Sequence, residues 1–73
     1  MPKLPILSAK ELIKILEKDG FFIERQRGSH IRMYHSFKDP ITVPNHKTIG
    51  RGLLKKILRD AQLSVKKLLE LAK

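Results

Sequence analysis

The sequence predicts an α+β fold, in which a three-stranded antiparallel sheet has helices packed on one face. Two observations support this class. Both ends of the chain repeat apolar residues with helical spacing, and the middle alternates apolar and polar residues between glycines and prolines. The expected order is α-β-β-β-α, with a further short C-terminal helix. With 73 residues, 41% of them hydrophobic, we expect one domain, residues 1–73, with a thin core and no deep cofactor pocket.

The first helix is expected at Ala9–Asp19. A lead-in, residues 1–7, contains two prolines, which favour extended backbone. Ser8 and Glu11 have the spacing of a capping box, and Gly20 stands where a left-handed residue would end the helix. The residues expected on its buried face are Ala9, Leu12, Ile13 and Leu16.

Three short strands are expected to form an antiparallel meander. Residues 21–27 are rich in aromatic and branched side chains and end at a glycine–serine turn, residues 28–29. Residues 30–37 alternate, and residues 41–43 form a third strand after a turn at residues 38–40. In the second strand we expect Ile31, Met33 and Phe37 to face the core, and His30, Arg32, Tyr34 and Ser36 to face the open side.

The register of the first hairpin decides which side chains are buried. A two-residue loop at residues 28–29 would pair Arg27 with His30 and leave Phe21 and Ile23 on the open face. A three-residue loop or a bulge would bring these two apolar residues to the core, where burial stabilises by about 1.5–3 kcal/mol each. We therefore predict a bulged turn that leaves His30 on the open face, with Arg27 in the turn beside it.

Two more helices are expected in the C-terminal third. A stretch with two glycines, residues 49–52, opens the first, and Ser64 can cap the second. The first would bury Leu53, Leu54, Ile57, Leu58 and Ala61, and the second Val65, Leu68, Leu69 and Ala72. The free N–H groups at residues 49–52 could bind phosphate, although lysines off an apolar stripe usually just face solvent. The basic residues around them are Lys47, Arg51, Lys55 and Lys56.

The positive charge is concentrated in the middle of the chain. The protein has 16 Lys+Arg and 7 Asp+Glu, a net charge of +9. Residues 25–59 contain nine basic residues and one acid, Asp39, and so carry +8 of that charge. A concentrated field of one sign favours a polyanionic partner, most commonly nucleic acid, whereas the bland alternative is a solubilising surface.

The composition favours a soluble cytoplasmic protein. The absence of cysteine fits a reducing compartment and leaves no thiolate metal site. The longest apolar stretches are as short as Phe21-Phe22-Ile23, so we expect neither a membrane span nor a signal sequence.

His30 is the sharpest candidate for chemistry, because it follows a glycine turn within a basic segment. The arginines around it in the sequence are Arg25, Arg27 and Arg32. A neutral imidazole can take the proton from an RNA 2′-OH so that the oxygen attacks its own phosphodiester, while arginines stabilise the charge on phosphorus. The alternative is an ordinary surface histidine in a basic patch.

Three other polar residues are weaker candidates. Ser29 either binds phosphate or only serves the turn. His46 lies in a loop, where it acts as a second acid or base, holds the loop by hydrogen bonds, or binds a phosphate. His35 shares the parity of the inward residues and is expected to be structural. Because the three histidines fall on opposite sheet faces and a loop, no zinc site is expected.

In several short motifs, the sequence resembles the HicA-type mRNA interferase toxins of bacterial and archaeal toxin–antitoxin pairs. The resemblance covers nearly the whole chain. Its residues are Gly20-Phe21, Arg25, Gly28-Ser29-His30, Pro44-Asn45-His46, residues 52–58 and residues 61–64. One departure is Leu53, which stands where the family commonly has threonine after the helix-opening glycine.

The resemblance implies a double-stranded-RNA-binding-domain-like fold and an endoribonuclease that cleaves mRNA through its motif histidine, here His30. It also implies a HicB-type antitoxin that masks the active site. The chemistry needs no metal or cofactor. RNA contacts are expected from Arg25, Arg27, Arg32, Lys47, Arg51, Lys55 and Lys56. Two other classes stay open: a non-catalytic RNA-binding module that uses the same basic surface, and a protein-interaction domain that meets an acidic partner.

Overall fold

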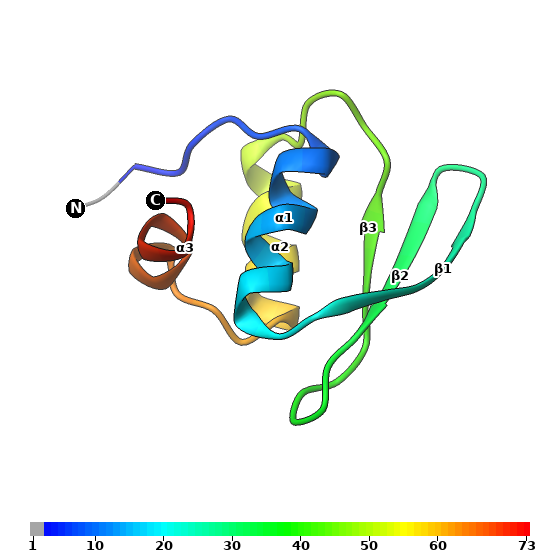
Figure 1. Ribbon diagram of the computed structural model, residues 1–73. Coiled ribbons are helices and arrows are strands. Elements are labelled where there is room, and N and C mark those ends of the chain that lie inside the picture. The colour runs from blue at the N-terminus through cyan, green and yellow to red at the C-terminus, as the bar shows by residue number, and fades with distance from the viewer. Residues whose placement is uncertain (1–2) are drawn as a thin grey trace.

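A computed structural model describes residues 3–73; Met1 and Pro2, the start of the lead-in, lie outside the described residues. The elements are α1 (Ala9–Asp19), β1 (Phe22–Arg27), β2 (His30–Tyr34), β3 (Ile41–Pro44), α2 (Arg51–Asp60) and α3 (Val65–Leu71) (Figure 1). The strands form one antiparallel sheet in the order β1-β2-β3. The predicted order of elements is confirmed.

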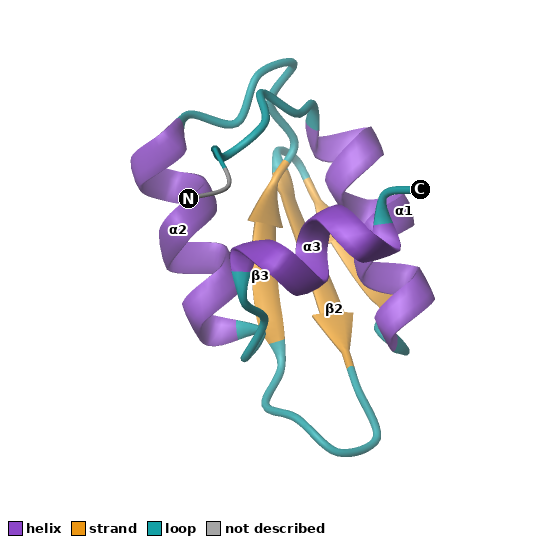
Figure 2. Cartoon of the chain, turned by 90° about the vertical axis from the view of Figure 1, so that its left-hand side faces the viewer, coloured by secondary structure: helices purple, strands orange, loops and turns teal. Residues whose placement is uncertain are grey.

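Helices α1 and α2 lie on one face of the sheet, and α3 crosses them on the side away from the sheet (Figure 1 and Figure 2). The largest fully buried side chains are Leu12, Leu16, Met33, Val43, Ile49, Leu54 and Leu68. They come from all three helices, two strands and the segment before α2. The α+β class is therefore confirmed, and no helix of residues 3–73 covers the opposite sheet face, called here the open face.

Helix α1 begins and ends as its sequence predicts. The hydroxyl of Ser8 accepts a hydrogen bond from the Glu11 N–H at 3.1 Å, and the Glu11 carboxylate accepts one from the Ser8 N–H at 3.0 Å. At the other end Gly20 is left-handed, with φ of +112°, and its N–H bonds the carbonyls of Leu16 and Glu17. Both ends of the helix thus have their free backbone groups satisfied.

Glu11 contributes to stability only while it is ionised. Hydrogen bonds from the Ser8 backbone N–H, and then from its hydroxyl, lower the pKa of Glu11 below its ordinary value of 4.5. Because the folded-state pKa is the lower one, the contribution is complete above the ordinary value and is lost as pH falls through the folded-state value. We expect Glu11→Ala to lower the thermal midpoint at neutral pH and to cost progressively less in acid. Melting curves from neutral pH to below 4.5 check this, and a constant difference would contradict it.

The β1–β2 hairpin corrects the predicted register. Its turn has two residues, 28–29, so Arg27 pairs with His30 within the strands instead of lying in a bulged turn. The glycine of the turn has φ of +54°, which allows this tight closure. A bulge does occur, but inside β1 just after Ile23, and it places Ile23 opposite Met33. Ile23 still remains 47% exposed, because β1 is the edge strand farthest from the helices (Figure 1).

The loop after β2 contains one wrong prediction and one confirmed prediction. Phe37 is 91% exposed instead of facing the core, because β2 ends at Tyr34 and the alternation ends with it. His35 is structural: its side chain is 8% exposed, and its ring packs edge-on against the ring of Phe21, with 4.7 Å between the ring centroids. Its Nδ1 accepts from the Phe37 N–H at 3.0 Å, and its Nε2 lies 2.9 Å from the Asp19 carbonyl. The ring hydrogen therefore sits on Nε2 and is donated to α1.

The lead-in and the segment after β3 hold each other in place. Ile49 donates its N–H to the Leu7 carbonyl at 2.7 Å, and the two residues form an isolated antiparallel bridge. Ala9 donates its N–H to the His46 carbonyl at 3.0 Å. These bonds fix the loop between β3 and α2 against the N-terminus of α1.

The last two helices form as predicted, but their buried faces match only in part, because Leu53, Val65 and Leu69 are half-buried. Gly50 is the N-cap of α2 and makes no side-chain hydrogen bond, whereas the Ser64 hydroxyl caps α3 by accepting from the Lys67 N–H. Leu68 is buried as expected, but Ala72 is exposed because it is the C-cap of a helix that ends at Leu71. None of the helices within residues 3–73 has the length and apolar character to cross a membrane.

Candidate functional site

The open face of the β1–β2 hairpin carries the basic residues that flank the glycine turn. Alternation along β2 buries Ile31 and turns its neighbours His30 and Arg32 outward. Their partners across the hairpin are Arg27 and Arg25. Since directly opposite residues in an antiparallel pair share a face, two strands bring three arginines and one histidine to one surface.

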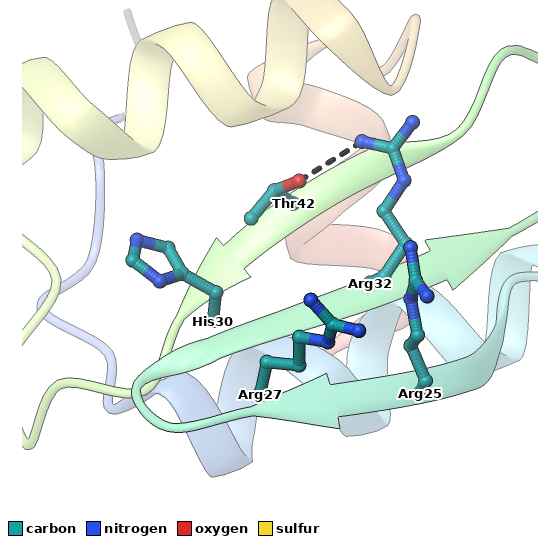
Figure 3. Close-up of a pocket in the computed structure, with 5 residues that line it drawn as sticks. All are labelled: Arg25, Arg27, His30, Arg32 and Thr42. Atoms are coloured by element: carbon teal, nitrogen blue, oxygen red, sulfur yellow. Dashed lines mark hydrogen bonds between the residues drawn. The ribbon is translucent and has the colours of Figure 1, made fainter.

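These side chains surround a shallow hollow of about 150 Å³. The lining residues are Arg25, Arg27, His30, Arg32 and Thr42 (Figure 3). In Figure 3 the His30 ring stands at one end of the hollow, and Arg25 and Arg32 stand toward the other. The volume is below the roughly 300 Å³ of a typical small-molecule pocket, so the hollow suits a phosphate or part of a nucleotide strand.

Most of the guanidinium charge in the hollow faces solvent. Arg32 Nη1 donates to the Thr42 hydroxyl at 3.0 Å, a neutral acceptor from β3 that orients the side chain without cancelling its charge. Arg25 has an exposed contact of 3.7 Å with the carboxylate of Glu24, a pair of little strength in water. Within residues 3–73, no carboxylate lies within ion-pair distance of Arg27 or Arg32. The hollow is therefore an anion-attracting surface.

The backbone around His30 is held on both sides, while its ring stays exposed. His30 is the first residue of β2 and pairs with Arg27 on one side and Pro44 on the other. The preceding turn is bonded to the loop after β3, because Asn45 donates its N–H to the Ser29 carbonyl at 2.6 Å. The ring is thus presented to solvent from a held backbone position, at one end of the arginine-lined hollow.

A second hollow of about 200 Å³ adjoins the first, because Arg32 and Thr42 line both. It lies between β3 and α2, and its lining includes the basic Lys56 and the acidic Asp60. The other basic residues predicted near the start of α2 line neither hollow, although all are exposed: Lys47, Arg51 and Lys55. The structure therefore joins Lys56 to the hairpin arginines and leaves the other three outside.

The remaining candidates stand apart from the His30 ring. Ser29 occupies the exposed turn and uses its carbonyl to bond Asn45. His46 is exposed in the next loop, bonds Ala9 through its carbonyl, and does not line the hollow. His35 is buried on the opposite side of the sheet edge, against Phe21. Across residues 3–73, no three His, Cys, Asp or Glu side chains form a group that could hold a metal.

Thr42 is the site residue that the sequence patterns did not reveal to us. It pairs with Arg32 across β2 and β3 and binds its guanidinium. The signal was present, because Thr42 stands between two buried strand residues, Ile41 and Val43, and must face the opposite side. Locating it beside Arg32 required the β2–β3 register as well.

Two comparisons with known proteins both find toxin–antitoxin proteins. A family model described as the HicA toxin of bacterial toxin–antitoxin systems matches residues 9–63. A chain from a toxin–antitoxin complex of Streptococcus pneumoniae superposes with a TM-score of 0.70 and 31% identity, covering 78% of this chain and 98% of that chain. No individually curated protein matches.

The family match covers more than half of the chain, from the first helical residue to just before the cap of α3. It contains every residue that lines the basic hollow. The protein therefore belongs to the HicA toxin family of bacterial toxin–antitoxin systems.

Proposed function

We propose that this HicA-family toxin is an endoribonuclease that cleaves mRNA without a metal ion, with His30 as the catalytic residue. One observation carries the proposal: a histidine and three arginines from two strands converge on one exposed hollow of the helix-free sheet face. A proton-transfer group beside anion-binding groups is what phosphodiester cleavage by an internal nucleophile needs.

In this mechanism the scissile phosphate lies in the hollow, and a neutral His30 takes the proton from the neighbouring 2′-OH. The 2′ oxygen then forms a bond to phosphorus while the bond from phosphorus to the 5′ oxygen breaks. The leaving 5′ oxygen takes up a proton from solvent water, and His30 returns its proton to the solvent. The products are a 2′,3′-cyclic phosphate and a 5′-hydroxyl end. The requirement for a 2′-OH explains the choice of RNA over DNA.

The arginines serve the same reaction in two ways. Arg27 is the register partner of His30, so we assign to its guanidinium the stabilisation of the charge that develops on the phosphoryl oxygens. Arg25 and Arg32 form the next outward pair and hold the adjoining backbone phosphates. Lys56 extends this contact across β3. Ser29 and His46 would act only as auxiliaries, and Lys47, Arg51 and Lys55 as more distant phosphate contacts.

The partners follow from the same proposal. The RNA substrate binds the open face, and an antitoxin of the HicB type covers that face to silence the toxin. The solved relative, a member of a toxin–antitoxin complex, supports such a partner. Because the substrate is mRNA, the site of action is the cytoplasm.

The test is cleavage of an end-labelled mRNA by the purified protein in EDTA, with analysis of the fragment ends. We expect fragments that carry 2′,3′-cyclic phosphate. RNA binding without cleavage would instead identify a non-catalytic RNA-binding module. Cleavage that stops in EDTA and returns with Mg²⁺ would overturn the metal-independent mechanism.

Phosphate binding by the hollow predicts a specific salt dependence. Replacing Arg25, Arg27 or Arg32 by alanine removes one phosphate contact, so each variant should reduce the slope of log affinity against log salt by about 1. Fluorescence anisotropy with a labelled RNA over a salt series measures this slope. Lys66→Ala is the matched control, because Lys66 is exposed on α3 in the helix layer, away from the open face (Figure 2). An equal reduction in Lys66→Ala would show only a general effect of net charge.

A further inference from the structure

The open face has an aromatic end as well as a basic one. Phe22 on β1 is 50% exposed and Tyr34 on β2 is 39% exposed. The two residues are register partners, and their ring centroids lie 6.4 Å apart at an interplanar angle of 44°. Large apolar side chains left this exposed on a small protein commonly mark a binding surface.

This pair continues the row of the proposed site. Along β2, His30, Arg32 and Tyr34 share the open face, while the residues between them are buried. The successive cross-strand pairs are Arg27 with His30, Arg25 with Arg32, and Phe22 with Tyr34. Along β2 the last pair lies four residue steps from the first, from His30 to Tyr34, which is a span of about 13 Å. The face therefore runs from a proton-transfer group, through two phosphate-binding groups, to two aromatic rings.

The bulge in β1 is what puts Phe22 in this row. Without the register shift after Ile23, strict alternation from Arg25 would place Ile23 on the open face and Phe22 on the core side. The shift exchanges the two, so that Ile23 opposes Met33 and Phe22 opposes Tyr34. The irregularity in the edge strand thus adds a second ring beside Tyr34.

We propose that Phe22 and Tyr34 form a stacking platform for an unpaired base of the RNA. The proposal rests on the proposed function and specifies its substrate as single-stranded RNA. The arginines bind the backbone, and the rings take a base a few nucleotides from the scissile phosphate, the combination of basic groove and aromatic faces used for single strands. In an A-form duplex the bases are stacked within the helix and unavailable to the rings. Phe22 and Tyr34 are therefore positioning residues that fix which phosphate reaches His30.

Continuity with the arginines favours RNA as the occupant of the rings when the toxin is free of its antitoxin. The neighbours of the rings along the open face are Arg25 and Arg32, and Arg32 makes no ion pair within the described residues. An apolar partner surface laid on the rings would have to cover these cations too. A nucleic acid strand meets both needs, with phosphates for the arginines and base faces for the rings.

The test uses the Phe22→Leu/Tyr34→Leu double variant, which keeps apolar volume but removes both planar rings. The double variant and the parent protein with intact rings both carry His30→Ala, so that binding is measured without cleavage. We expect the double variant to bind a single-stranded RNA about 5- to 150-fold more weakly, with an unchanged salt slope. A 2-aminopurine base scanned along the RNA should be quenched at one position by the parent protein and not by the variant. A duplex of the same sequence should show no dependence on the rings.

Phe37→Leu is the matched control. It makes the same chemical change at a ring that is 91% exposed but lies in the loop after β2, outside the sheet. An equal loss of affinity in this control would overturn the platform. So would unchanged affinity in the folded double variant; the single variants, each checked by circular dichroism, serve if the double variant unfolds. If the protein with intact His30 neither binds nor cleaves RNA, the proposed function fails together with this inference. If it cleaves normally but the rings do not matter, only the platform fails.

Discussion

Replacing His30 by alanine is expected to reduce the rate of RNA cleavage by about 10²- to 10⁴-fold, the usual contribution of a positioned acid or base. The side chain is exposed and makes no hydrogen bond with another described residue, so its loss should leave the fold intact. RNA affinity should fall little, because the arginines around the hollow remain. Single-turnover cleavage and anisotropy on the same protein samples separate the two effects.

Gln26→Ala is the control for this experiment. Gln26 neighbours Arg27 on β1 but pairs with Ile31, on the side away from the hollow. We expect cleavage by Gln26→Ala close to that of the wild type. His46→Ala measures whether the loop histidine assists; its ring lies outside the hollow, so we expect a far smaller effect than at His30. Cleavage by His30→Ala at the wild-type rate would disprove its catalytic role.

Gly20→Ala is expected to destabilise the protein by about 2–4 kcal/mol. The residue has φ of +112°, which strains any residue with a Cβ, and a Cβ added there would lie 2.9 Å from His35 Nε2. The imidazole cannot easily move, because it bonds the Asp19 carbonyl and the Phe37 N–H and packs on Phe21. For a domain of this size, the thermal midpoint should fall by roughly 10 °C or more.

Gly52→Ala provides the opposite expectation within the same protein. Gly52 lies in the first turn of α2, has no positive φ, and has open space where a Cβ would stand. Alanine there should leave stability unchanged or raise it by about 0.5–1 kcal/mol through its better helix propensity. Thermal and urea melts of the two variants decide the matter. If Gly20→Ala and Gly52→Ala lowered stability equally, neither the positive φ of Gly20 nor its closeness to His35 would explain the loss.

The sequence contained the elements of this fold because most of their signals are local. The capping box at Ser8 and the stop at Gly20 fixed both ends of α1, and the alternation in β2 fixed which face His30 uses. The position of the bulge could not be read in this way. One extra residue, in the turn or in the strand, was needed to bring Ile23 to the same face as Met33. Which of the two positions holds it depends on pairing with β2 over the whole length of β1.

The part of the site that lies in one hairpin could be predicted from the sequence, whereas the parts from other elements could not. Because Arg25, Arg27 and Arg32 flank His30 in the same hairpin, short-range pairing brings them together. Thr42 and Lys56 come from elements farther along the chain, and only the β2–β3 register and the packing of α2 place them beside Arg32. Phe37 went wrong for a related reason: its apolar side chain continues the alternation of β2 in the sequence, but the strand that would have buried it ends at Tyr34.

The irregular edge strand also bears on how copies of this protein behave toward one another. β1 has a neighbour on one side only, so its outer backbone edge can in principle accept a strand from another molecule. The bulge breaks the regular spacing of that edge, and Glu24, Arg25 and Arg27 project exposed charges along it. Two such edges brought together would be out of step at the bulge. The strand that displays half of the site is therefore a poor template for fibrillar self-assembly, even though it is uncovered.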